Sequence, residues 1–352
     1  MLEASIKQLI GRGVVIPAHP LALTRERRLD ERRQRALSRY YIAAGAGGLA
    51  IGVHTTQFSI RDPRIGLYEP LLQLAADEMN RADRSRIEPL VRVGGICGNT
   101  KHAVQEAQLL ADLGYHAGLL SLASFADAED AALVQHCRIV SEIIPIFGFY
   151  LQASVGGRVL SSQFWREFLE IENVAAIKIA PFNRYQTLDV LRAVCESNRP
   201  IPLYTGNDDN IVMDLLTPYA FDVNGERREI RIRGGLLGHW AVWTRGAVEL
   251  LRDCQTVVHN DNGVPKELLR RSVEVTDANA AFFDVAHGFA GSIPGLHEVL
   301  RRQGLLEGIW CLDPEKTLSP GQKEEIDRVY AAYPHLSDDE FVRQGLDEWL
   351  RP

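Results

Sequence analysis

The feature that most constrains the fold is a regular alternation of short apolar runs with amphipathic stretches over the first two-thirds of the chain. Predicted strands cover residues 13–20, 48–53, 89–96, 117–122, 145–150, 174–180, 201–205 and 232–237. Predicted helices follow them at residues 30–44, 68–82, 99–113, 129–143, 162–171, 187–197, 211–219 and 242–254. The strand runs are continuously apolar rather than alternating, which is typical of a parallel sheet covered by helices.

Eight strand–helix units predict a closed (β/α)8 TIM barrel rather than an open doubly wound sheet. An open sheet usually carries a glycine-rich turn after its first strand, whereas residues 17–20 here read Pro-Ala-His-Pro. The chain beyond the eighth unit has no strand rhythm and is predicted to be helical. We therefore expect a barrel over residues 1–255 and a C-terminal helical extension over residues 256–352. The charged segment 224–229 predicts a surface turn or small hairpin before the eighth strand.

Charge and composition exclude several classes of partner. The net charge of -7 argues against nucleic acid and anionic membranes, because both require a basic surface. No apolar run reaches the roughly 18 residues that span a bilayer, and residues 1–13 lack the apolar core of a signal peptide. The five cysteines are scattered and form no CxxC pair, which indicates free thiols in a reducing compartment. We expect a cytoplasmic protein that acts on small molecules.

Active sites of such barrels lie at the C-terminal ends of the strands, which selects a short set of polar residues. The set contains His19, His54, Thr55, Thr56, Ser121, Tyr150, Lys178, Gly206, Asn207, Asp208, Asp209, His239 and Trp240. Lys178 is the most informative, because it interrupts an otherwise apolar strand. A lysine is almost never fully buried unless it is paired or reactive. Burial lowers the pKa of the amine, which favours attack on a carbonyl group, while the alternative is a barrel lysine paired with a carboxylate.

Tyr150 ends the strand before Lys178, so its phenol could stand beside the lysine and move protons. Thr55 or Thr56 could orient that phenol with a hydrogen bond. The alternatives are a rim aromatic that covers the barrel mouth and threonines placed by their β-propensity. Asp208 and Asp209 could cap the helix expected near residue 210.

These residues resemble the dihydrodipicolinate synthase / N-acetylneuraminate lyase family of class I aldolase-type barrels, over about residues 14–333. The motifs that carry the resemblance are Ile177-Lys178-Ile179-Ala180, Tyr150 with the run 151–157, His54-Thr55-Thr56-Gln57-Phe58, Thr205-Gly206-Asn207-Asp208-Asp209, and the segments 291–296 and 318–320. Each motif is incomplete, but their order and spacing agree with one another.

The resemblance implies that Lys178 forms an imine with the keto group of a 2-oxo acid, such as pyruvate or a 2-keto-3-deoxy sugar acid. Tyr150 would relay protons, oriented by Thr56, and the backbone of Thr55 and Thr56 would hold the substrate carboxylate. We expect further substrate contacts from His54, Gly206, Asp208 and His239. The covalent imine replaces any cofactor, and no metal is expected. An aldehyde is the expected second partner, and a homo-oligomer is the expected assembly.

The sequence also departs from this family. The threonine loop has lost its flanking glycines and its glutamate, and the family's Pro-Tyr-Tyr run is here 123–125, Ala-Ser-Phe. An arginine that binds a substrate carboxylate in the synthases would fall at Val155, with Arg158 nearby but out of register. These changes leave the aldolase chemistry in place but argue against the lysine-pathway synthase activity.

Two other interpretations use the same residues. His19, His54 and His239 end neighbouring strands of a closed barrel, so three imidazoles could bind a catalytic metal in a lyase or hydrolase. The chain could also be a non-catalytic protein that binds a 2-oxo acid. The pairing expected between Lys178 and Tyr150 argues against that last interpretation.

Overall fold

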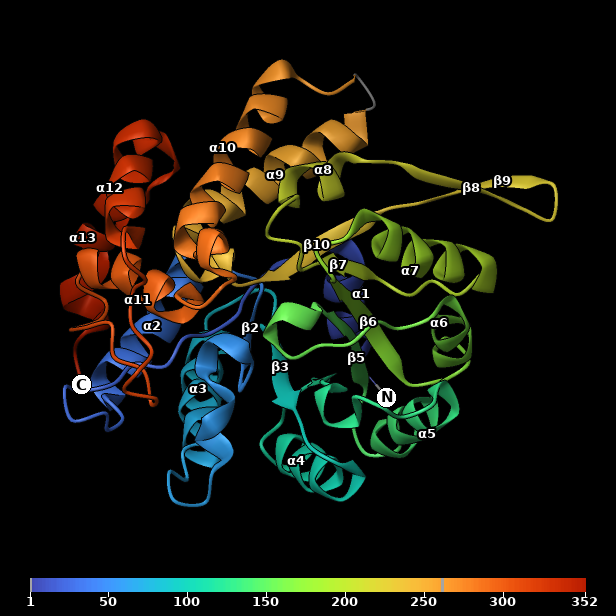
Figure 1. Cartoon of the computed structure of the whole chain (residues 1–352), viewed down its shortest axis with the longest axis horizontal. Coiled ribbons are helices and arrows are strands. Elements are labelled where there is room, and N and C mark those ends of the chain that lie inside the picture. Colours follow the sequence, from blue (N-terminus) through green and yellow to red (C-terminus); the bar gives the residue numbers. More distant parts are fainter. Residues whose placement is uncertain (1, 261–262) are drawn as a thin grey trace.

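The computed structural model describes residues 2–260 and 263–352 and contains a barrel of eight parallel strands (Figure 1). The strands are β1 (Val15–Pro17), β2 (Gly48–Ile51), β3 (Val91–Ile96), β4 (Ala117–Leu120), β5 (Ile146–Leu151), β6 (Val174–Ala180), β7 (Leu203–Thr205) and β10 (Ile232–Leu237). Their order is β1-β10-β7-β6-β5-β4-β3-β2, and a parallel bridge between Ala18 and Ala50 joins β1 to β2. The predicted (β/α)8 barrel is confirmed.

Helices surround the strands in the predicted order. They are α2 (Glu31–Ala44), α3 (Tyr68–Asp83), α4 (Thr100–Asp112), α5 (Asp130–Ser141), α6 (Ser162–Phe168), α7 (Arg184–Ser197), α8 (Ile211–Leu216) and α9 (Thr244–Asn260). Side chains of Asp30, Asn99 and Ser161 accept hydrogen bonds from backbone amides in the first turns of α2, α4 and α6. Such caps stabilise a helix start by about 1 kcal/mol each, which explains why these boundaries were readable in the sequence.

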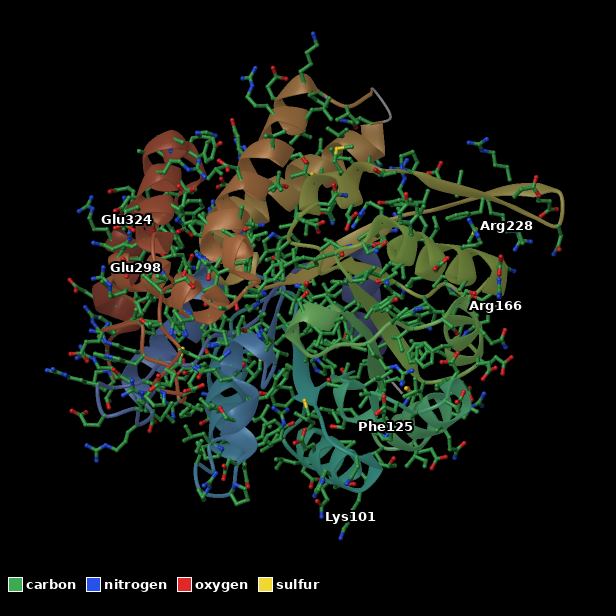
Figure 2. The ribbon with its side chains drawn as sticks, viewed as in Figure 1. Lys101, Phe125, Arg166, Arg228, Glu298 and Glu324 are labelled. Carbon is green, nitrogen blue, oxygen red and sulfur yellow. The ribbon has the colours of Figure 1, made fainter. Side chains whose placement is uncertain are left out.

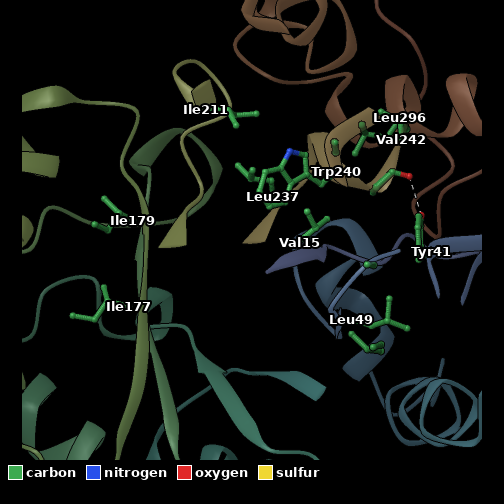
Figure 3. Close-up of a cluster of buried hydrophobic side chains, with 14 of the residues drawn as sticks. Val15, Tyr41, Leu49, Ile177, Ile179, Ile211, Leu237, Trp240, Val242 and Leu296 are labelled. Carbon is green, nitrogen blue, oxygen red and sulfur yellow. Dashed lines mark hydrogen bonds between the residues drawn. The ribbon is translucent and has the colours of Figure 1, made fainter. Parts of the chain in front are cut away.

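Side chains alternate along each strand between the barrel interior and the helix layer. On β6, Ile177 and Ile179 belong to the apolar cluster shared with the helices (Figure 3), whereas Ala176 and Ala180 belong to the cluster inside the barrel. Lys178 lies between the two isoleucines and therefore points to the interior. This alternation decides which polar residues can meet at the barrel mouth.

A short helix and a two-stranded hairpin are added to the eight strand–helix units. Helix α1 (Ala4–Arg12), which the sequence analysis did not predict, contacts β3, β6 and β10, and its Ile10 carbonyl accepts a hydrogen bond from Tyr204 at 3.0 Å. Strands β8 (Tyr219–Val223) and β9 (Glu226–Ile230) form the predicted hairpin, which projects past α7 (Figure 1). Asn224 and Gly225 form its turn with φ of 55° and 81°, as a two-residue hairpin loop requires.

The regular elements within residues 263–352 are helical, as predicted. They are α10 (Lys266–Phe282), α11 (Ser292–Arg302), α12 (Gln322–Ala332) and α13 (Asp339–Trp349). Helix α13 packs on α2, and α10 packs on α8 and brings its C-terminal end to the barrel mouth. Buried Asp338 accepts hydrogen bonds from the Tyr40 hydroxyl at 2.7 Å and from the Arg245 amide at 2.9 Å, which ties this region to the barrel.

Single 3-10 turns occur at η1 (His54–Thr56), η2 (Phe58–Arg61), η3 (Ala123–Phe125), η4 (Ala153–Val155), η5 (His239–Ala241), η6 (Val285–His287) and η7 (Pro334–Leu336). Charged side chains such as Lys101 and Arg166 extend from the outer surface (Figure 2). Among the described helices, none has both the length and the apolar character needed to cross a membrane.

Candidate active site

Lys178 lies inside the barrel with 8% of its surface exposed. It is paired in register with Phe149 of β5, and its Nζ lies 4.6 Å from the centre of the Phe149 ring. Burial lowers the pKa of Lys178 below its ordinary value, and the charge of Asp208 opposes part of that shift. The amine therefore loses its proton more easily than a surface lysine does, which is what attack on a carbonyl carbon requires.

Gly206, directly after β7, makes room for the lysine. A Cβ at this position would lie 2.6 Å from Cε of Lys178 and 2.7 Å from Cβ of Ala180. Any larger residue would push the lysine stem out of its present path. The predicted site glycine is therefore a steric requirement for the position of the amine.

Asp208 is buried beside Lys178, and its Oδ1 accepts a hydrogen bond from the backbone amide of His239 at 3.0 Å. Burial raises the pKa of Asp208 well above that of an ordinary aspartate, and the lysine charge opposes the shift. The idea that Asp208 caps the next helix is wrong, since its carboxylate is bonded to His239 and α8 has no side-chain cap.

Two adjoining cavities lie at this end of the barrel. The inner cavity has a volume of about 70 Å³ and is lined by Lys178, Phe149, His54, Thr55 and Asp208, among others. The outer chamber has a volume of about 490 Å³ and lies over the ends of β5, β6 and β7 and against α10. Residues that line both are Leu151, Gln152, Phe182, Asp208, Phe283 and Phe289. The two cavities therefore adjoin and share part of their walls.

The prediction that Tyr150 stands beside Lys178 is wrong. Tyr150 pairs in register with Ile179 and faces the helix layer, where its ring packs on Trp165 at 5.6 Å. Its hydroxyl accepts from the Leu160 amide at 3.2 Å and donates to the Leu160 carbonyl at 3.3 Å. The adjacent residue, Phe149, occupies the interior position, and a phenyl ring has no proton to exchange.

The prediction that Thr55 or Thr56 orients a phenol is also wrong. Thr56 donates its hydroxyl proton to the His19 carbonyl at 2.7 Å and accepts from the Gly52 amide at 3.0 Å. Thr55 donates to the Ala18 carbonyl at 2.7 Å. Both hydroxyls join the ends of β1 and β2, although Thr55 still lines the inner cavity.

The three histidines of the metal hypothesis do not converge. His19 is buried against α2, where its Nε2 bonds to Ser38 at 2.9 Å and its Nδ1 bonds to the Pro20 carbonyl at 2.8 Å. The ring of His239 stacks beside Phe282 in the helix layer, while His54 lines the inner cavity. Across residues 2–260 and 263–352, no three His, Cys, Asp or Glu side chains are grouped as metal ligands would be. The metal-dependent alternative is therefore wrong for these residues.

The contributions of His54 and His239 differ from those expected. Burial lowers the pKa of His54 to about 4, with the charge of Lys178 as the next cause, so the ring beside the lysine is neutral near pH 7. His239 reaches the site through its backbone amide on Asp208 rather than through its imidazole. Arg158 lines the outer chamber, and one of its Nη atoms donates to the backbone carbonyls of Phe125 and Ala128.

A buried network supports the site, and of its residues the sequence indicated Thr205 and Asn207 but not Asp214. Asp214 of α8 is fully buried and accepts from the Thr205 hydroxyl at 2.7 Å and from the Asn207 amide at 3.0 Å. Asn207 in turn accepts from the backbone amide of Phe182 at 3.1 Å. The sequence signal for Asp214 is an acidic residue within an apolar helical stretch. Nothing local indicates that Phe149 rather than Tyr150 faces inward.

No protein-family model matches the sequence, and no curated protein matches it. Solved structures do match. A dihydrodipicolinate synthase from Aquifex aeolicus is 17% identical over 93% of this chain and 99% of its own, with a TM-score of 0.71. An N-acetylneuraminate lyase from Fusobacterium nucleatum complexed with pyruvate is 15% identical over 93% and 99%, with a TM-score of 0.69.

A third similar structure is a prophage protein of the dihydrodipicolinic acid synthase family from E. coli K12, in complex with pyruvate. It is 15% identical over 92% of this chain and 98% of its own, with a TM-score of 0.72. Identities this low establish a shared fold. The resemblance found in the sequence is therefore confirmed at the level of the fold, over nearly the whole length of these proteins.

Proposed function

We propose that this chain is a divergent member of the dihydrodipicolinate synthase / N-acetylneuraminate lyase family and a Schiff-base lyase for a 2-oxo acid. The observation that carries the proposal is Lys178, a buried amine with a lowered pKa that reaches a cavity kept open by Gly206. Two structures with this fold are described as complexes with pyruvate, which suggests a 2-oxo acid for this cavity.

The first step is imine formation. The neutral amine of Lys178 bonds to C2 of the 2-oxo acid, and its two hydrogens leave with the keto oxygen as water. The backbone at Thr55, which lines the inner cavity, holds the substrate carboxylate in this proposal, whereas the Thr56 amide already donates to the Val53 carbonyl at 3.0 Å. The neutral His54 ring and Gly206 line the space around the keto carbon.

Later steps move a proton at C3 and at the hydroxyl of C4. Tyr150 cannot serve, because its hydroxyl is held on the far side of β5 by the Leu160 backbone. Asp208 lines the same cavity as Lys178, and burial brings its pKa closer to neutrality. We assign the proton transfer to Asp208, since an acid–base catalyst works best with a pKa near the working pH.

The test is a panel of 2-oxo acids incubated with the protein and borohydride, followed by peptide mass spectrometry. We expect a stable adduct on the peptide that carries Lys178 and none on the exposed Lys101. Release of an aldehyde or of water from the matching substrate would establish the lyase. Turnover without a lysine adduct would contradict the mechanism.

A second candidate function is a non-catalytic protein that binds a 2-oxo acid. The observation in its favour is Phe149, which occupies the interior position next to Lys178 where a phenol was expected. Tyr204 also pairs in register with Lys178, but its hydroxyl donates to the Ile10 carbonyl at 3.0 Å and accepts from the Val14 amide at 3.3 Å. An adduct without turnover of any substrate in the panel would favour this candidate. Cytoplasmic location, a homo-oligomeric assembly and a domain boundary at residue 255 remain parts of the proposal.

A further inference from the structure

One face of helix α10 lies against the segment that follows β7. The hydroxyl of Thr276 donates a hydrogen bond to the backbone carbonyl of Asp209 at 3.0 Å. The side-chain amide of Asn279 donates to the backbone carbonyl of Asp208 at 2.6 Å. Thr276 and Asn279 are three residues apart, so both lie on the same face of the helix. The C-terminal helical region therefore holds two consecutive residues at the barrel mouth, and one of them is the group to which we assign the proton transfer.

Stability alone does not explain an asparagine at this place in α10. Asn279 is 3% exposed, and the other buried residues of the helix are apolar. Among the described residues, its buried Oδ1 has no hydrogen-bond partner. An amide with an unsatisfied buried atom costs more free energy than an apolar side chain of the same shape. The hydrogen bond from its Nδ2 to Asp208 is therefore the contact that accounts for this residue.

The end of the neighbouring strand β10 holds the same aspartate. The backbone amide of His239 donates to Oδ1 of Asp208 at 3.0 Å, and the His239 ring stacks beside Phe282 of α10. Burial lowers the pKa of His239 to about 4, and the Asn279 side chain opposes part of that shift, so the two side chains lie near each other. The main chain of Asp208 is thus held by Asn279, and its carboxylate is held by His239.

We infer that Asn279 is a positioning residue for Asp208, because its hydrogen bond fixes the main chain from which the carboxylate reaches the substrate. Asn279 lines the outer chamber but not the inner cavity, so it acts through Asp208 rather than on the reacting carbon. The inference rests on the proposed function, because it requires an imine on Lys178 and proton transfer by Asp208. A catalytic group displaced by about 1 Å loses on the order of 10²-fold in rate, and the contact from α10 prevents such a displacement.

The step that depends on this position is removal of a proton from C3, and pyruvate alone is enough to observe it. In the pyruvate imine, once water has protonated its nitrogen, a C3–H bond breaks and its electron pair forms the C2–C3 double bond of the enamine. The nitrogen becomes neutral, and the proton passes to the carboxylate of Asp208. In D2O the carboxyl group exchanges this proton for a deuteron and returns the deuteron to C3. The methyl hydrogens of pyruvate are therefore replaced at a rate that reports on Asp208.

The test measures two rates with pyruvate, at a pH above the midpoint of adduct formation. Nuclear magnetic resonance follows hydrogen exchange at the methyl group, and mass spectrometry follows the borohydride adduct on Lys178. Asn279→Leu removes the donor and keeps a similar volume. We expect this variant to lose about 10- to 100-fold in exchange, while adduct formation changes by less than about threefold. Circular dichroism checks the fold, and Asn279→Ala replaces the leucine variant if that one does not fold.

The matched control is Thr276→Val, which removes the parallel hydrogen bond from α10 to Asp209 and should leave both rates unchanged. A double variant separates positioning of Asp208 from general damage to the site. Asp208→Asn should lose most of the exchange by itself. Adding Asn279→Leu should not lower the residual exchange further, because two residues that act through one group are not additive.

The outcomes separate this inference from the proposed function. Unchanged exchange in Asn279→Leu, an equal loss in Thr276→Val, or a further loss in the double variant would overturn the role of Asn279 and leave the lyase proposal in place. An adduct without hydrogen exchange in the unaltered protein would remove Asp208 from the proton transfer, and this inference would fall with it. No adduct with pyruvate or with any other 2-oxo acid of the panel would overturn the proposed function itself.

Discussion

Two groups of polar residues lie at the same end of the barrel and differ in how fully their hydrogen-bonding atoms are used. At β1 and β2, both ring nitrogens of His19 have partners, and the hydroxyls of Thr55 and Thr56 donate to backbone carbonyls. At β6, the amine of Lys178 lies over the Phe149 ring and is influenced by the charge of the Asp208 carboxylate. No hydrogen bond within the described residues holds this amine.

The difference separates structural from reactive groups. A buried polar atom with all its partners stabilises the fold and has little left to offer a ligand. An amine that is buried without a partner is costly to fold, and it is available to a carbonyl carbon that enters the cavity. Both groups consist of residues that the sequence analysis placed at strand ends, so position alone could not distinguish them.

The largest expected effect is loss of the amine. Lys178→Ala should abolish the borohydride adduct and turnover, because no other group in the cavity can form the imine. Lys178→Arg should fail as well, since a guanidinium keeps its proton in proteins. Mass spectrometry of the trapped protein measures the adduct, and circular dichroism checks the fold. Residual imine-dependent turnover in Lys178→Ala would place the chemistry elsewhere.

Displacing the amine should be the next largest effect. In Gly206→Ala the new Cβ must push Cε of Lys178 away, and a misplacement of about 1 Å costs on the order of 10²-fold in rate. Gly11→Ala is the matched control, because a Cβ there has nothing within 4 Å. Stopped-time trapping with pyruvate gives the two rates. Equal rates in both variants would show that Gly206 does not restrict the position of the Lys178 side chain.

Damage to the β1–β2 group should affect stability rather than chemistry. His19→Ala leaves buried partners such as Ser38 without their bonds and should lower the free energy of unfolding by about 2–4 kcal/mol. Urea denaturation measures this loss, with exposed His102→Ala as control. Adduct formation on Lys178 should persist in the folded variant. A stable variant that has lost the adduct would contradict the division between the two groups.

Protonation of His19 should make the stability of the fold depend on pH in a defined direction. Burial lowers the pKa of His19 to about 4 from its ordinary 6.5. The unfolded chain therefore takes up this proton first, and stability falls as the pH decreases from 6.5 toward 4. The His19→Ala variant should lose part of that dependence.

Apart from the loss of turnover expected when the proton-transfer group is removed, a smaller effect on adduct formation concerns the charge next to the amine. Asp208 stabilises the ammonium form of Lys178, so Asp208→Asn should lower the pKa of the lysine further. The midpoint of adduct formation against pH should then shift to lower pH by about one unit. Asp209→Asn is the control, since Asp209 lines only the outer chamber. A shift to higher pH, or equal shifts in both variants, would remove Asp208 from the neighbourhood of the amine.

The smallest effect is expected at Tyr150. Tyr150→Phe removes two backbone hydrogen bonds and should cost about 1 kcal/mol of stability. Turnover should change by less than about threefold, whereas a proton relay would lose roughly 10²–10⁴-fold. Steady-state kinetics with the substrate identified in the 2-oxo acid panel decides between these values. A loss in the larger range would return Tyr150 to the mechanism.

The sequence by itself determined the barrel, the hairpin at Asn224 and Gly225, and the place of Lys178 on a buried strand. Those features depend on local periodicity, caps and turn residues, which act within a few positions of the chain. It also placed Gly206 and Asp208 at the strand end that adjoins the lysine.

Only the tertiary structure decided which side chains share the cavity. Phe149 and Tyr150 are consecutive on β5. A shift of this strand by one residue would place the Tyr150 phenol inside the barrel instead of the Phe149 ring. That alternation is fixed by packing on both sides of the strand, where the Tyr150 hydroxyl finds the Leu160 backbone in the helix layer. The partners of His19, Thr55 and Thr56 likewise come from neighbouring segments rather than from their own strands. Satisfaction of buried polar groups is a property of the assembled barrel, and no single strand encodes it.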